Sequence, residues 1–143
     1  PEGDHLVPFG EAVIRRPGRD LTILGISRGA VIAIEAADVL EREHGLSAEV
    51  IDPRTLRPLD LPMIIESVQR TNRLLIVEEG WPQGGVGASI AALVQEHAFD
   101  FLDGPVMRVT GADAPIGYSR VLERAAQADG RAVAQAALAA LGR

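Results

Sequence analysis

The sequence predicts an α/β fold of three layers, α/β/α, in which helices cover both faces of a mostly parallel sheet with one antiparallel edge strand. Two observations lead to this prediction. Short apolar runs, which suit strands covered on both faces, alternate along the chain with longer segments of helical periodicity. The spacing between these runs leaves room for a helix in each connection, as parallel neighbours require.

The expected strands are short and rich in branched apolar residues. The first two, at residues 12–16 and 20–27, flank Pro17 and Gly18, and we interpret them as an antiparallel hairpin at the sheet edge. The second is apolar nearly throughout, as a strand buried on both faces should be. Further strands are expected at residues 48–51, 73–77 and 106–109.

The expected helices carry recognisable end signals. Gly45 should end a helix over residues 28–44 in a left-handed turn, and Asp60 should cap a helix that tolerates Pro62 in its first turn. Other helices are expected at residues 87–97, 119–126 and 131–141. Residues 1–10 are polar and broken by proline and glycine, which predicts an arm or linker before one domain at residues 11–143.

Composition narrows the possible partners. The 143 residues have a net charge of −6 and only 14 Lys and Arg, so nucleic acid and anionic membranes are not expected partners. No apolar run approaches the roughly 18 residues that a membrane span needs. The absence of Cys excludes disulfides and thiolate metal sites and fits a cytoplasmic protein. Because the chain begins with Pro1, we expect a fragment, a processed product or an incomplete record.

A glycine-rich segment, VEEGWPQGGVGASIA at residues 77–91, predicts a sharp crossover from a strand to a helix. Its glycine spacing matches neither a dinucleotide fingerprint nor a P-loop, so tight packing is favoured over a phosphate site. Trp81, the single tryptophan, is either an interface anchor or a lid over the core, and we favour the anchor.

Acidic and imidazole groups do not form an obvious catalytic set. Glu78 and Glu79 end a strand, where neighbours point to opposite faces, so salt bridging or helix capping is favoured over acid–base chemistry. The three histidines, His5, His44 and His97, lack metal-ligand spacing and are expected to be structural. We therefore predict no catalytic residue and no metal ligand.

Ser27 supports a competing hypothesis. The sequence GISRG at residues 25–29 fits the five-residue nucleophile-elbow pattern and lies between a strand and a helix. A serine hydrolase would also need an acid and then a histidine later in the chain, near the top of the sheet. His44 and His97 are poorly placed for that role, although a free-standing hydrolase using Ser27 remains the rival class.

Several segments together resemble the transketolase C-terminal-like domain of the β subunit of pyruvate dehydrogenase first components. They are residues 7–12, 48–60, 77–91 and 98–118, in that order, together with the closing helix. The resemblance implies a sheet of five strands. It also implies that thiamine diphosphate and Mg²⁺ lie between two other domains, whose activating Glu and GDG motif are absent here. No cofactor is therefore expected to be bound by this chain alone.

By the same resemblance, the chain is expected to be an assembly and docking module of a thiamine-dependent, pyruvate-type 2-oxoacid dehydrogenase. The implied partners are other domains or subunits of the first component, in an oligomer, and the subunit-binding domain of the dihydrolipoyl acyltransferase. The acid that contacts this basic partner falls at Asp103. The family also uses its terminal carboxylate, where Arg143 is expected to weaken the attraction. A separated regulatory or interaction domain is a further alternative.

Overall fold

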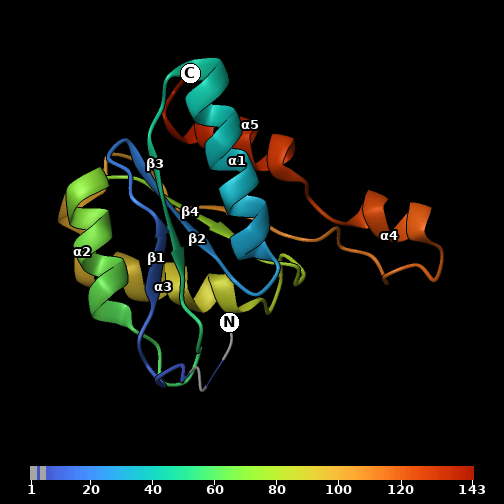
Figure 1. The fold of residues 1–143 in the computed structure, drawn as a ribbon, viewed down its shortest axis with the longest axis horizontal. Coiled ribbons are helices and arrows are strands. Elements are labelled where there is room, and N and C mark those ends of the chain that lie inside the picture. Colours follow the sequence, from blue (N-terminus) through green and yellow to red (C-terminus); the bar gives the residue numbers. More distant parts are fainter. Residues whose placement is uncertain (1–2, 4–5) are drawn as a thin grey trace.

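A computed structural model describes residue 3 and residues 6–143 of the chain. It contains a five-stranded sheet in the order β1-β3-β2-β4-β5, parallel except for the β1–β3 pair (Figure 1). The strands are β1 (Val13–Arg16), β2 (Leu21–Gly25), β3 (Ala48–Asp52), β4 (Leu74–Val77) and β5 (Met107–Val109). The predicted α/β class, with an antiparallel edge strand, is confirmed.

Helices cover both faces of the sheet. α1 (Gly29–His44) and α5 (Gly130–Ala140) pack on one face, and α2 (Leu61–Thr71) and α3 (Val86–Ala98) pack on the other (Figure 1). Alternate strand residues divide between the two cores, because successive side chains of a strand point to opposite faces. In β2, for example, Leu21 and Ile23 face α1 and α5, whereas Leu24 faces α2 and α3.

The predicted hairpin between the first two strands is wrong. β1 pairs with β3, and β2 lies at the centre of the sheet between β3 and β4. The connection crosses the start of β3, where the amides of Arg19 and Asp20 donate to the Ser47 carbonyl at 2.9 Å. Burial explains the order of the strands, since β2 is buried throughout, whereas β1 leaves Ile14 and Arg15 exposed, which an edge position tolerates.

Helix ends follow the expected chemistry. Gly45 ends α1 with φ +65°, and Asp60 caps α2 by accepting from the Met63 amide at 3.2 Å. The carboxylate of Asp60 also accepts from the Ala12 amide at 2.9 Å, which joins the start of β1 to α2. Asn72 ends α2 in a left-handed conformation with φ +58°.

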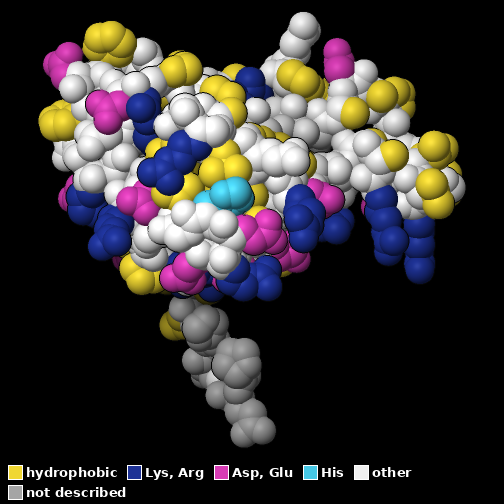
Figure 2. Space-filling view, turned by 90° about the horizontal axis from the view of Figure 1, so that it is seen from above, with side chains coloured by type: hydrophobic (Ala, Val, Ile, Leu, Met, Phe, Trp, Pro, Cys, Tyr) yellow, Lys and Arg dark blue, Asp and Glu magenta, His cyan; other side chains and the backbone are white. Residues whose placement is uncertain are grey.

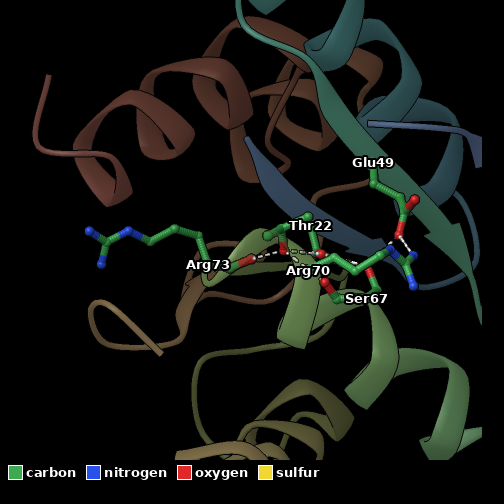
Figure 3. Close-up of polar contacts among 6 residues, drawn as sticks. Thr22, Glu49, Ser67, Arg70 and Arg73 are labelled. Atoms are coloured by element: carbon green, nitrogen blue, oxygen red, sulfur yellow. Dashed lines mark hydrogen bonds and ion pairs between the residues drawn. The ribbon is translucent and has the colours of Figure 1, made fainter. Parts of the chain in front are cut away.

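A buried polar network joins α2 to the centre of the sheet (Figure 3). The Thr22 hydroxyl contacts the hydroxyls of Ser67 and Thr71, each at 2.6 Å. Ser67 in turn donates to Glu49 at 2.5 Å, and Arg70 donates to the same carboxylate oxygen at 2.6 Å. The buried hydroxyls and the Glu49 carboxylate are satisfied by one another and by the half-exposed Arg70, so the network fixes α2 against β2 and β3.

One segment departs from this packing. We call residues 112–127, which include α4 (Arg120–Ala126), the α4 arm. The arm projects from the body of the molecule at the right of Figures 1 and 2, where hydrophobic and arginine side chains are visible on its surface. α4 buries none of its residues. At its base, the Ala112 amide donates to the Ala126 carbonyl at 2.8 Å and Arg28 donates to Gln127 at 3.0 Å.

Across the described residues, none of the helices is long and apolar enough to cross a membrane.

Candidate functional site

An open cleft of about 490 Å³ lies where β2 and β4 end. These strands flank the point at which the chain order of the sheet reverses, and ligands of parallel α/β sheets commonly bind at such a point. The cleft is lined by residues that follow the two strands, by the glycine-rich loop and by the arm: Ile26, Ser27, Glu78, Glu79, Gly80, Trp81, Gln83, Gly84, Gly85, Val86 and Ile116.

Glu78 organises this edge of the sheet. It is buried, its carboxylate accepts from Arg108 at 2.8 Å, and it also accepts from the Gly87 amide in the first turn of α3 at 3.1 Å. Arg108 donates in addition to the Pro82 carbonyl at 2.9 Å, so the pair holds the glycine-rich loop against β5. The expectation that salt bridging or helix capping explains Glu78 is confirmed.

The glycines of the loop make room for this carboxylate. A Cβ on Gly87 would collide with a Glu78 oxygen, and one on Gly85 would come within 2.7 Å of the other oxygen. Tight packing therefore accounts for these glycines, as expected. Since the Glu78 carboxylate already occupies the electropositive start of α3, a phosphate bound there would meet like charge.

Comparison with known proteins identifies the domain. The family model for the C-terminal domain of transketolase matches residues 10–133. The chain belongs to the transketolase C-terminal domain family. Among solved structures, it is similar to a split-gene transketolase, an inactive β4 tetramer, with a TM-score of 0.82 and 29% identity over 97% of this chain and 44% of that chain.

Curated relatives of this transketolase C-terminal domain are β subunits of the pyruvate dehydrogenase E1 component. The mitochondrial protein of Dictyostelium discoideum is 49% identical over 94% of the chain and 37% of its own length. The Homo sapiens mitochondrial protein is 50% identical over 84% and 33%, and the Rhizobium meliloti protein is 47% identical over 86% and 26%. The chain thus spans about a third of the length of these relatives, some of which are mitochondrial and some bacterial.

Ser27 has the backbone of a nucleophile elbow without its partners. Its φ of +57° between β2 and α1 matches the strained turn that the GISRG pattern predicts. His44, however, ends the 16-residue α1, about 24 Å from its start, and His97 lies in the last turn of α3. Within the described part of the chain, no histidine lines the cleft beside Ser27; His5 lies outside it. Among the described residues of this transketolase C-terminal domain, neither His44 nor His97 is placed to complete a hydrolase triad with Ser27.

The three residues expected to contact partners lie at two edges of the sheet. Trp81 lies at the carboxyl edge, where its indole N–H donates to the Ala114 carbonyl at 3.2 Å and its side chain is 53% exposed. Asp103 precedes β5 at the amino edge and is exposed. Arg143 is exposed at the carboxyl terminus, which Figure 1 shows at the amino edge of the strands. Tertiary structure thus separates Trp81 from Asp103 and Arg143.

Sequence reasoning missed Arg108 and Asn72, two residues that shape these edges. The alternation of side chains along β5 could have located Arg108. Its neighbours Met107 and Val109 pack toward α1 and α5, so Arg108 must face the α3 side, where Glu78 lies. For Asn72, the one indication in the sequence was that Asn is favoured in the left-handed turn at the end of a helix.

Proposed function

We propose that this chain is the assembly and docking module of a thiamine diphosphate-dependent, pyruvate-type 2-oxoacid dehydrogenase first component. The complete enzyme would decarboxylate a 2-oxoacid and pass the acyl group to lipoyl. The identity of 47–50% to β subunits of pyruvate dehydrogenase E1 supports this reading, as does the match to the transketolase C-terminal domain.

The observation that carries the proposal is the uncovered apolar surface of the α4 arm. Four of its side chains are 59% or more exposed: Ile116, Tyr118, Val121 and Leu122. A helix of seven residues is marginal in water unless something packs against it. Covering the arm would require residues outside this domain.

The arm continues into the cleft at the carboxyl edge. Ile116 and Trp81 both line the cleft, and the Trp81 indole is held by the arm residue Ala114. An exposed tryptophan with a fixed indole beside aliphatic side chains is the composition of an interface hot spot. We infer that this edge holds subunits together in an oligomer, and the tetrameric state of the split-gene transketolase supports the inference.

The described residues do not fit a thiamine diphosphate and Mg²⁺ site. None of their His, Asp and Glu side chains cluster in a way that could hold a metal ion. At the cleft, the Glu78 carboxylate already takes the Gly87 amide that a diphosphate would use. We therefore assign the cofactor to other parts of the first component, and this domain to assembly.

Docking would use the opposite edge. Asp103 is exposed there, and the acidic chain, with its net charge of −6, favours a basic partner. The subunit-binding domain of the dihydrolipoyl acyltransferase is the partner that we propose for this edge.

Sedimentation velocity tests the assembly role. We expect the chain to sediment as an oligomer at tens of micromolar and Val121→Asp to shift it toward monomer, because a buried unpaired carboxylate destabilises an apolar interface. Ala92→Asp adds the same charge to an exposed position of α3 and should leave the mass unchanged. A wild-type chain that stays monomeric at all concentrations would remove self-association from the proposal.

A further inference from the structure

Arg73 begins a surface feature at the amino edge that the function above does not use. Its carbonyl accepts from the Thr22 amide at 2.9 Å and from the Thr71 hydroxyl at 3.2 Å, so its backbone is part of the buried polar network. Figure 3 shows its side chain directed away from that network. The Arg73 side chain therefore extends from a short connection between α2 and β4 whose backbone is held by these hydrogen bonds.

The side chain of Arg73 lies over Gly104. A Cβ at Gly104 would collide with the guanidinium, which places the cation against the residue that follows Asp103. Arg73 is half-buried, and none of the described carboxylates, Asp103 included, comes within 4.0 Å to form a salt bridge with it. A guanidinium without an acceptor retains its preference for a planar carboxylate.

Asn72 fixes Asp103 from the other side. Its carbonyl accepts from the Asp103 amide at 3.0 Å, and its side-chain amide donates to the Phe101 carbonyl at 2.8 Å. These two hydrogen bonds span the segment that carries Asp103, and the left-handed conformation of Asn72 directs them there. One cation and one anion are thus held on adjacent, hydrogen-bonded backbone.

We propose that Arg73 is a second recognition residue of the docking edge and that it pairs with a carboxylate of the partner. This proposal rests on the docking function assigned to Asp103. A partner carrying only basic groups would be attracted by Asp103 and repelled by Arg73. The opposite charges of these two residues nearly cancel at a distance. A partner that places an acidic side chain beside a basic one satisfies both and is held in a single orientation.

A merely structural role for Arg73 has a different signature. If the guanidinium only supported Gly104, replacing Arg73 would lower the free energy of unfolding. Any effect on partner binding would then be the same whatever the charge of the new side chain at position 73. Recognition of a carboxylate instead makes the effect depend on the charge at position 73 and on the salt concentration.

Calorimetric titration with the purified subunit-binding domain of the acyltransferase from the same organism separates these cases. At low ionic strength we expect Asp103→Ala and Arg73→Gln each to weaken binding, Arg73→Gln by about threefold, as for an exposed charge pair. Arg73→Glu should weaken it further, and Arg73→Lys should retain most of it. Arg54→Gln removes an exposed arginine at the carboxyl edge and serves as the control. Thermal unfolding of each variant checks that the fold is intact.

The outcomes separate the proposal from the function on which it rests. If the wild-type chain does not bind, or Asp103→Ala binds as tightly as wild type, the docking function fails and the proposal with it. If Asp103→Ala weakens binding while Arg73→Gln leaves it unchanged or tightens it, docking stands and the role of Arg73 is overturned. Weakening by both, with the Arg73→Gln effect disappearing in high salt, supports the proposal.

Discussion

Single residues at the carboxyl edge show how a charge can serve the fold instead of a ligand. Glu78 is one of few buried charged side chains among the described residues, and it meets both an arginine and the start of a helix. Burying a charge is tolerable only where partners replace the lost water, and Arg108 and Gly87 supply them here.

Replacing Glu78 tests this role. Glu78→Ala removes the carboxylate that pairs with Arg108 and uncaps α3, so we expect a loss of about 2–3 kcal/mol of stability, measured by urea unfolding. Glu79→Ala, which removes the neighbouring half-buried carboxylate, should change stability by less than about 0.5 kcal/mol. Equal effects of the two substitutions would show that Glu78 has no special structural role.

At the level of elements, the helices differ in what their caps stabilise. Asp60 caps α2 and also binds the Ala12 amide, so it joins a helix, an edge strand and the core. Ser119 caps α4 by accepting from the Leu122 amide at 3.2 Å, but α4 buries nothing. A side-chain cap at Asp60 should therefore contribute more to the stability of the domain than the same kind of cap at Ser119.

We expect Asp60→Ala to lower the free energy of unfolding by about 2 kcal/mol, because it removes a cap and leaves the buried Ala12 amide without its acceptor. Ser119→Ala should leave the global unfolding transition within about 0.3 kcal/mol of wild type, since the α4 arm contributes little to the core. Circular dichroism during chemical unfolding measures both. A large effect of Ser119→Ala would mean that the arm is coupled to the core after all.

At the level of the whole molecule, the function proposed above gives the two edges of the sheet separate tasks. The carboxyl edge combines Trp81 with the apolar arm and suits subunit contacts, whereas the amino edge presents Arg73 and Asp103 and suits a charged partner. Under this proposal, one domain would contact two polypeptides at once.

We expect the isolated chain to bind no thiamine diphosphate in calorimetry, with or without Mg²⁺. The α3 amino end is already neutralised by Glu78, and the described residues contain no cluster of metal ligands. An intact pyruvate dehydrogenase first component provides the positive control. Micromolar or tighter binding by this chain would contradict its assignment to assembly alone.

Much of the fold could be read from local patterns. The apolar run of β2, the cap at Asp60 and the left-handed turn at Gly45 depend on neighbours in sequence, and all were predicted with their physical reasons. The pairing of β1 was not, because an edge strand can lie against either neighbour with the same side-chain pattern. Sheet order is a non-local choice that depends on which strand is most fully buried.

The sequence by itself determined the α/β class, the helix ends and the resemblance that led to the family, because each depends on residue type and short spacing. Only the tertiary structure decided which side chains contact one another. It paired Glu78 with Arg108 across 30 positions of sequence, left Ser27 without a histidine among the described residues, and placed Arg73 over Gly104. These outcomes depend on distances between segments far apart in the chain, and no local pattern specifies such distances.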